Sequence, residues 1–203
     1  MIACLDLEGV LLPEIWIKFA EKSGIDELKI TTRNIPDYST LMQKRLQILK
    51  VNKLKIDDIR DVIDTLEPLE GAKEFLGWLK TEFQVIILSD TFYEFSGPLM
   101  KQLGNPTLFC HQLIIDKNGN IIDFKLRQTD QKTKAVKALQ GLNFKVVSAG
   151  DSYNDIGMLQ QADSGILFCP PKNVANEFPQ FPIAQNYQDF QVLLLEARDK
   201  LKV

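Results

Sequence analysis

The stretch Ile2-Ala3-Cys4-Leu5-Asp6-Leu7-Glu8-Gly9-Val10 tells more about the architecture of this protein than any other part of the chain. Its first residues form a short apolar run, which is typical of a buried strand. Asp and Glu are poor strand formers and Gly favours a turn, so we expect the strand to end near Leu5. Asp6 and Glu8 then lie at its carboxyl end, where open α/β sheets bind ligands. The alternative interpretation is a solvated acidic turn, and this stretch alone does not decide between the two.

The composition is that of a globular protein with one sizeable core. The chain has 203 residues, of which 45% are hydrophobic and 25% are charged. The net charge is -3 and no basic stripe is visible, which disfavours nucleic acid as a partner. No apolar run approaches the roughly 18 residues of a membrane span, and no basic segment precedes the first apolar run as in a signal peptide. We therefore expect a soluble, cytoplasmic protein with no nucleic-acid or membrane partner.

The cysteines Cys4, Cys110 and Cys169 are far apart in the sequence and match no zinc spacing. Each follows apolar residues, so we expect three buried free thiols in a reducing compartment. His111 is the only histidine, and its position directly after Cys110 gives no ready-made Cys-His dyad. A structural or surface role is therefore favoured for His111.

Between the first strand and Pro68 the pattern is helical. Apolar residues recur at helical spacing in three segments, namely about 14–22, 41–49 and 57–66. Ser39 and Asp57 are candidate N-caps for the second and third of these helices. We expect residues 12–68 to form a helical cap domain, inserted into a core domain made of residues 1–11 and 69–203.

After Gly71 helices and strands alternate. The expected strands are 85–88, 107–110, 145–149 and 165–169. The expected helices are 75–83, 92–103, 130–140 and 156–162, with a short helix from about 188. The Asn118-Gly119 pair predicts a hairpin at about 113–124. This alternation predicts an α/β fold with a doubly wound parallel sheet that is covered by helices on both faces.

Three of the expected strands end in polar clusters, namely Asp6/Glu8, Ser89/Asp90 and Asp151/Asn154/Asp155. Because the carboxyl ends of parallel strands meet at one edge of a sheet, we expect the clusters to converge on one crevice. The carboxylates of Asp6, Glu8, Asp151 and Asp155 would repel one another there if all were ionised. Mg²⁺ is a hard dication that prefers oxygen ligands, so it would remove this repulsion. A phosphate beside the metal would need hydroxyl or N–H donors and a cation, such as Ser89 and a lysine.

The same residues resemble the four motifs of the haloacid dehalogenase superfamily. The motifs are Asp6-Leu7-Glu8-Gly9-Val10, Ser89, Lys132 and Gly150-Asp151-Ser152-Tyr153-Asn154-Asp155. The helical insert is similar to the cap of the phosphoserine phosphatase branch. The resemblance is closest to the bifunctional phosphoserine phosphatase/phosphoserine:homoserine phosphotransferase enzymes, because ordinary phosphoserine phosphatases usually have Asp and Gly where this chain has Glu8 and Asp90.

The resemblance implies a catalytic and metal-binding set. Asp6 is the nucleophile that becomes an aspartyl phosphate, and Glu8 is the general acid and then the general base. Mg²⁺ is bound by the Asp6 carboxylate, the Glu8 backbone carbonyl and Asp151. Asp155 supports the metal's surroundings or Lys132. Glu8 is one methylene longer than the usual Asp, which leaves the ratio of hydrolysis to transfer open.

The resemblance also implies how the phosphate is bound. Ser89 and Lys132 hold the transferring phosphoryl oxygens, and Asn154 contacts substrate or phosphate. Lys134 is a rival for the lysine, but Lys132 opens the expected helix and its spacing to the last motif fits the family. Asp90 is suggested by its position alone, and its backbone N–H is favoured over its carboxylate.

Recognition of phosphoserine is assigned to the cap. In the family a glutamate meets the substrate ammonium and an arginine meets its carboxylate, and Glu14 and Arg45 match those positions. The alternative for each is a solvated helix residue. Arg45 interrupts an apolar neighbourhood and can bind a carboxylate bidentately. Arg33 is a further anion-binding candidate, but a solvated loop residue is the favoured interpretation.

The resemblance thus implies Mg²⁺-dependent phosphoryl transfer from O-phospho-L-serine through Asp6 to water or to L-homoserine. The first alternative is a plain phosphatase for phosphoserine or another small phosphomonoester. The second is a non-catalytic binding module on the same fold. A dehalogenase is disfavoured, because Asp151 and the lysine suit a metal and a phosphate. A homodimer is one assembly state that the sequence leaves open.

Overall fold

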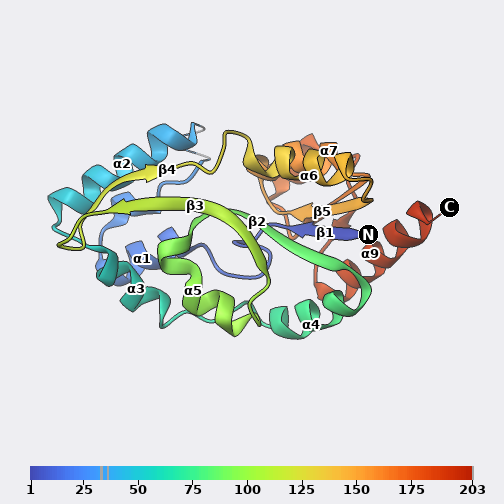
Figure 1. The fold of residues 1–203 in the computed structure, drawn as a ribbon, viewed down its shortest axis with the longest axis horizontal. Helices are drawn as coiled ribbons and strands as arrows, with labels where there is room; N and C mark the ends of the chain where they lie inside the picture. The colour runs from blue at the N-terminus through green and yellow to red at the C-terminus, as the bar shows by residue number, and fades with distance from the viewer. Residues whose placement is uncertain (33, 36, 203) are drawn as a thin grey trace.

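The structure is a computed structural model that describes residues 1–32, 34–35 and 37–202. Arg33, considered above as an anion-binding residue, lies outside the described residues. The chain forms one sheet covered by helices, with a group of helices at one end of an elongated molecule (Figure 1). No helix in the described part of the chain is long and apolar enough to span a membrane.

The described residues form a seven-stranded sheet in the order β4-β3-β2-β1-β5-β6-β7. The strands are β1 (Ile2–Leu5), β2 (Gln84–Phe92), β3 (Thr107–Ile115), β4 (Ile121–Lys125), β5 (Val146–Gly150), β6 (Ser164–Phe168) and β7 (Ile183–Ala184). All neighbouring strands are parallel except β3 and β4, which form the antiparallel hairpin. The strand β1 lies between β2 and β5, so the three predicted polar clusters belong to adjacent strands.

Helices cover both faces of the sheet, as the alternating pattern predicted. They are α4 (Ala72–Glu82), α5 (Tyr93–Gln102), α6 (Gln131–Gly141), α7 (Ile156–Gln161), α8 (Lys172–Glu177) and α9 (Tyr187–Leu201). In β1 the side chains alternate between the two faces. Ala3 and Leu5 join the larger core cluster, whereas Ile2 and Cys4 join the cluster that includes Val136 of α6. The doubly wound α/β fold is therefore confirmed.

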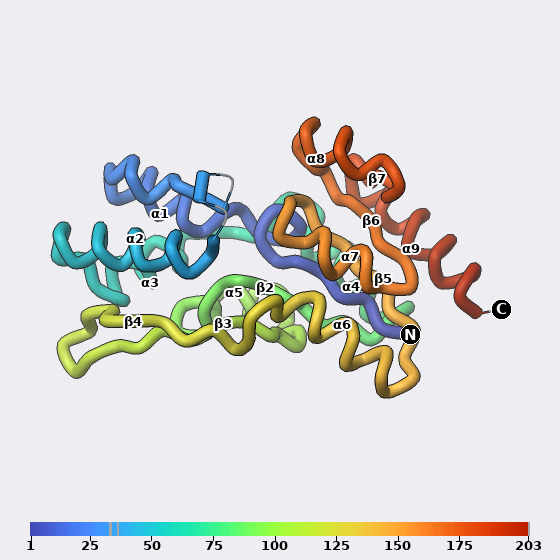
Figure 2. Tube along the Cα trace, turned by 90° about the horizontal axis from the view of Figure 1, so that it is seen from above, coloured from blue at the N-terminus to red at the C-terminus, as the bar shows by residue number. Residues whose placement is uncertain are grey.

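The segment between β1 and α4 contains helices, and they lie beside the far end of the hairpin. They are α1 (Ile15–Ser23), a short 3₁₀ helix η1 (Asp26–Lys29), α2 (Tyr38–Val51) and α3 (Ile56–Ile63). Figure 2 shows this group at the opposite end of the molecule from both chain termini. Two backbone acceptors attach α3 to the rest of the fold: Gly119 O accepts from Ile56 N at 3.0 Å, and Glu94 O accepts from Arg60 Nε at 3.0 Å.

Both predicted helix caps were wrong. The N-cap of α2 is Asp37, whose carboxylate accepts a hydrogen bond from the Thr40 backbone N–H at 2.8 Å, so Ser39 lies inside the helix. Helix α3 begins at Ile56, one residue before Asp57, and the Asp58 carboxylate accepts from the Lys55 N–H at 2.6 Å. In both cases a carboxylate beside the predicted residue satisfies a backbone donor that the helix cannot pair internally.

Two strands, β2 and β3, are longer than the sequence pattern indicated. β3 is one continuous strand that joins the predicted strand 107–110 to the first arm of the hairpin. β2 continues to Phe92 with an irregular register against β3 after Leu88, so Ser89 and Asp90 lie within an irregular part of the strand rather than after it. The pairing of β2 with β1 nevertheless ends at Ile87, which leaves both polar residues beyond the end of β1.

The prediction of three buried cysteines was wrong for Cys169. Cys4 and Cys110 are buried, and burial raises the pKa of each thiol to about 12. Cys169 is exposed because it follows the last residue of β6, where the chain turns with a positive φ of 44°. Its Sγ lies 3.2 Å from Gln185 O.

Candidate active site

A pocket lies where the carboxyl ends of β1, β2 and β5 face helices α1 and α2. Its lining residues are Asp6, Glu8, Glu14, Trp16, Thr31, Thr32, Tyr38, Leu41, Arg45, Ser89, Asp90, Lys132, Asp151, Ser152 and Asn154. Every residue that the sequence proposed for the site therefore lines this pocket, except Asp155. Asp155 is fully buried and contacts Lys132, which does line it. Residues as far apart in sequence as Asp6 and Asn154 are thus brought together at one sheet edge, as expected.

Asp6 is the first residue after β1 and is almost fully buried, with 4% of its surface exposed. Its backbone N–H donates to Ala149 O at 2.9 Å, which fixes the residue against β5. Its Oδ1 accepts from Leu7 N at 2.7 Å and lies 2.8 Å from Lys132 Nζ. Burial and the charge of Asp155 raise the pKa of Asp6 well above its usual range, and Lys132 offsets this only in part. A further cation would keep Asp6 ionised.

Glycines let the two acidic loops come close together. Gly9 has a φ of 81°, and a Cβ on it would lie 2.6 Å from the Asp151 carboxyl carbon. A Cβ on Gly150 would lie 2.3 Å from the carboxyl carbon of Asp155. Both distances are far inside van der Waals contact. The absence of a side chain at these two positions therefore leaves room for the carboxylates of Asp151 and Asp155.

The donor set fits Mg²⁺. Asp6, Asp151 and Asp155 are all buried, and one carboxylate oxygen from each lies within 4.8 Å of the others. An all-oxygen set of a few carboxylates is what Mg²⁺ prefers. Asp155 is the least suited to direct ligation, because its Oδ2 accepts from the backbone N–H groups of Asp151 and Ser152 at 3.0 and 3.1 Å. Its Oδ1 accepts from Lys132 Nζ at 2.8 Å, and a supporting role for Asp155 stays a prediction.

Lys132 lies in the first turn of α6, and 3% of its surface is exposed. Its Nζ is 2.8 Å from Asp6, 2.8 Å from Asp155 and 3.8 Å from Asp90. Burial would lower the pKa of Lys132, but these carboxylates outweigh burial and raise it well above its usual range. A fixed cation therefore stands beside the Asp6 carboxylate, whereas the rival Lys134 points to Thr129 Oγ1.

Glu8 and Glu14 lie on the side of the pocket formed by α1. Glu8 Oε2 accepts from the Ile15 backbone N–H at 2.9 Å, which ties the loop after β1 to the start of the helix. Burial, together with the nearby charge of Glu14, raises the pKa of Glu8 to about 8. A carboxyl group with this pKa is protonated at neutral pH and can donate a proton.

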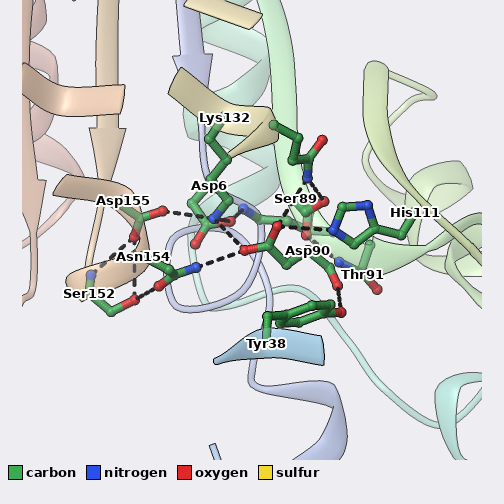
Figure 3. A network of polar contacts seen from close by, with 12 residues as sticks. Asp6, Tyr38, Ser89, Asp90, Thr91, His111, Lys132, Ser152, Asn154 and Asp155 are labelled. Carbon is green, nitrogen blue, oxygen red and sulfur yellow. Dashed lines mark hydrogen bonds and ion pairs between the residues drawn. The ribbon is translucent and has the colours of Figure 1, made fainter. Parts of the chain in front are cut away.

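Asp90, which follows Ser89, accepts several hydrogen bonds in the wall of the pocket (Figure 3). Its Oδ1 lies 3.3 Å from His111 Nε2 and accepts from Gln131 Nε2 at 3.1 Å, and its Oδ2 accepts from Asn154 Nδ2 at 3.1 Å. Burial would raise the pKa of Asp90, but Lys132 and these hydrogen bonds lower it well below its usual range. The carboxylate oxygens are thus engaged by protein donors.

Three residues of this network were missed by the sequence reasoning as parts of the site. Tyr38, at the start of α2, donates its hydroxyl proton to Asp90 O at 2.5 Å. Gln131 Nε2 donates to Ser89 O at 2.5 Å. His111 is 2% exposed, which excludes the surface role that the sequence left open beside a structural one. Gln131 directly precedes the proposed lysine, and this adjacency was the one available signal; Tyr38 and His111 gave none.

Arg45 is a buried cation on α2 with 5% of its surface exposed. Its guanidinium lies over the Trp16 ring at 4.5 Å, and its Nη2 donates to Ile30 O at 2.7 Å. Among the described residues no carboxylate pairs with it, and its Nε is buried without a hydrogen-bond partner. Burial lowers the pKa of Arg45, yet a guanidinium stays charged in proteins. A buried, unpaired cation in a pocket is a ready site for an anion.

A family model described as haloacid dehalogenase-like hydrolase matches residues 2–163 of this chain. The chain belongs to this family. The match confirms the family membership that the sequence motifs predicted. The match covers β1 to α7 and includes every residue proposed for the site.

Two curated relatives resemble the haloacid dehalogenase-like chain over nearly its whole length. It is 59% identical over 199 residues to "Phosphoserine phosphatase ThrH" of Pseudomonas aeruginosa, which covers 98% of this chain and 97% of that protein. It is 56% identical over 199 residues to "Phosphoserine phosphatase" of Pseudomonas syringae pv. tomato, which covers 98% of this chain and 84% of that protein.

Solved structures share the fold of this haloacid dehalogenase-like chain. A substrate-bound phosphoserine phosphatase complex superposes with a TM-score of 0.76 at 20% identity, covering 96% of this chain and 97% of the other. A phospho-aspartyl intermediate analogue of phosphoserine phosphatase superposes with a TM-score of 0.73 at 23% identity, covering 90% and 91%. At these identities the likeness establishes the fold.

Proposed function

We propose that this protein catalyses Mg²⁺-dependent phosphoryl transfer from O-phospho-L-serine through Asp6. The observation that carries the proposal is Arg45, a buried cation without a carboxylate partner among the described residues, which lines the same pocket as Asp6 and Lys132. A substrate that satisfies this pocket needs a phosphate at one end and a second anion at the other. The names of the two curated relatives support phosphoserine as that substrate.

We propose that α1, α2 and α3 act as a cap that recognises the amino-acid part of the substrate. Glu14 directly precedes α1 and Arg45 lies on α2, so both belong to this group of helices. The substrate carboxylate would pair with the Arg45 guanidinium, which desolvation makes a strong bidentate partner. The Glu14 carboxylate would meet the substrate ammonium. This pair gives selectivity for a zwitterionic phosphomonoester over a simple one.

In the first half-reaction the Asp6 carboxylate attacks phosphorus and the bond from phosphorus to the serine oxygen breaks. Asp6 and Asp151 would hold Mg²⁺ together with the Glu8 backbone carbonyl, and the metal would neutralise charge on the nucleophile and on the phosphoryl group. Lys132 supplies a second, fixed positive charge beside Asp6. Ser89 accepts from Thr91 N at 3.2 Å and can direct its own O–H at a phosphoryl oxygen.

Glu8 moves the protons. With a pKa of about 8 it is protonated at neutral pH, so it can give its proton to the departing serine oxygen. The resulting carboxylate then takes a proton from the acceptor that attacks the aspartyl phosphate. Water as the acceptor gives inorganic phosphate, and L-homoserine gives O-phosphohomoserine. Because the acceptor enters the place that serine leaves, Glu14 and Arg45 can bind either amino acid.

The test is product analysis with O-phospho-L-serine and Mg²⁺, with and without L-homoserine. We expect phosphate release without homoserine and O-phosphohomoserine with it, both abolished in Asp6→Asn. Release of phosphate alone would leave a plain phosphatase. Turnover of p-nitrophenyl phosphate without any turnover of phosphoserine would refute the substrate assignment, and loss of all Mg²⁺-dependent turnover would favour the non-catalytic module. A cytoplasmic location stays a prediction from the sequence, which leaves the homodimer open.

A further inference from the structure

One hydrogen bond joins the proposed cap to the backbone carbonyl of Asp90, the residue after Ser89. The Tyr38 hydroxyl donates to Asp90 O at 2.5 Å, across 52 positions of sequence. The Tyr38 ring packs against His111 at 5.5 Å between ring centroids and against Phe124 at 6.5 Å. The hydroxyl is therefore aimed at Asp90 by contacts on the ring as well as by the helix that carries it (Figure 3).

Tyr38 and Arg45 lie on the same face of α2. They are separated by about two helical turns, and Leu41 stands between them; all three line the pocket. Two turns correspond to about 10 Å along the helix axis. The position of Arg45 relative to the phosphate end of the pocket is therefore set by where the first turn of α2 is held.

The acceptor of this hydrogen bond is itself fixed from the core side. The Asp90 carboxylate is bound by His111 of β3, Gln131 of α6 and Asn154 of the 3₁₀ helix that follows β5. Gln131 also binds Ser89 O, so the whole Ser89-Asp90 segment is held by core residues. The Ser89-Asp90 segment is therefore held in position without Tyr38, whereas the hydrogen bond to this segment fixes the first turn of α2.

We propose that Tyr38 is a positioning residue, whose hydroxyl sets the distance between Arg45 and the phosphoryl site by tying the first turn of α2 to Asp90. This inference rests on the proposed function, because it assigns Arg45 to the substrate carboxylate. Loss of the hydroxyl should impair substrates that use both ends of the pocket and spare those that use the phosphate end alone. Burial raises the pKa of Tyr38 well above its usual range, so the hydroxyl keeps its proton near neutral pH.

The test is Tyr38→Phe, which removes the hydroxyl and keeps the ring that packs on His111 and Phe124. We expect kcat/KM for O-phospho-L-serine to fall about tenfold, which is the worth of one good hydrogen bond. For p-nitrophenyl phosphate, which has no amino-acid part, we expect a change of less than about twofold. The matched control is Tyr93→Phe, which also removes a tyrosine bond to a backbone carbonyl, Leu108 O at 2.8 Å, away from the pocket lining.

A double-mutant cycle with Arg45→Ala makes the test specific. If Tyr38 acts through Arg45, then Tyr38→Phe has no further effect on phosphoserine turnover once Arg45 is gone. An equal loss on both substrates, or a full additional loss in the Arg45→Ala background, would overturn the inference alone. Absence of phosphoserine turnover by the wild-type protein would instead overturn the proposed function, and the inference with it.

Discussion

Replacing Gly9 with Ala should weaken Mg²⁺ binding, in addition to lowering stability through backbone strain. Gly9 has a φ of 81°, and the added Cβ would lie 2.6 Å from both Cγ and Oδ2 of Asp151. Gly24, which ends α1, has a similar φ of 70°, and apart from Gly24 and its two chain neighbours no described residue has an atom within 4 Å of the place that an added Cβ would take there. Gly24→Ala therefore carries the same backbone strain without the clash, and the difference between the two variants isolates the contact with Asp151.

The expected magnitudes follow from this geometry. A left-handed conformation costs a residue with a Cβ about 1–2 kcal/mol, and both variants lose this much in the free energy of unfolding. Gly9→Ala must also displace the buried Asp151 carboxylate, and overpacking of this kind costs a further roughly 1–3 kcal/mol. Because Asp151 belongs to the proposed Mg²⁺ ligands, its displacement should also weaken the binding of the metal.

The assays are urea unfolding of both variants without metal, and phosphoserine turnover as a function of Mg²⁺ concentration. We expect the Mg²⁺ concentration for half-maximal activity to rise at least about tenfold in Gly9→Ala, since each tenfold corresponds to about 1.4 kcal/mol of lost binding. In Gly24→Ala it should not change. The reasoning is refuted if the two variants lose the same stability and show the same dependence on Mg²⁺.

Three further predictions concern single side chains. Arg45→Met keeps the packing on Trp16 and removes an unpaired buried charge. We therefore expect kcat/KM for phosphoserine to fall by about 100-fold or more, while the free energy of unfolding changes by less than about 1 kcal/mol. A large loss of stability in urea with unchanged selectivity would make Arg45 structural. Because the pKa of Glu8 is raised from 4.5 to about 8, kcat/KM for phosphoserine should fall as the pH rises through about 8. The residual activity of Glu8→Gln should not show this fall. A wild-type profile that stays flat from pH 6 to roughly 9 would contradict the role of Glu8 as general acid. A maleimide reagent should label Cys169 in the native protein and reach Cys4 only after unfolding, as mass spectrometry of the labelled peptides would show; native labelling of Cys4 would contradict its burial.

The sequence was sufficient to predict the sheet and the convergence of its polar strand ends. Short apolar runs that end in Asp6 and Asp151 are local signals, and the rule that parallel strands end at one edge turns them into a statement about space. Lys132 was identified from the resemblance to the family, because its spacing to the last motif fits that family. The motifs were thus sufficient to bring Asp6, Ser89 and Lys132 to one pocket, while their roles toward a phosphate stay predictions.

Contacts between distant parts of the chain were beyond the sequence patterns. Nothing near Tyr38 indicates that its hydroxyl reaches Asp90, because the partner is set by how α2 packs on the hairpin. His111 could not be assigned for the same reason, since its role depends on an irregular part of β2 that periodicity does not reveal. Cys169 was misplaced because an apolar run does not show at which residue a strand leaves the sheet.

The most direct test of the central claim is to trap the phosphorylated enzyme. The protein is mixed with O-phospho-L-serine and Mg²⁺, quenched in acid within one turnover, and reduced with borohydride, which converts an aspartyl phosphate into a homoserine residue. Peptide mass spectrometry then locates the change. We predict conversion at Asp6 in the wild type, and none in Asp6→Asn. Turnover with no reduced residue, or with conversion at another carboxylate, would contradict the account.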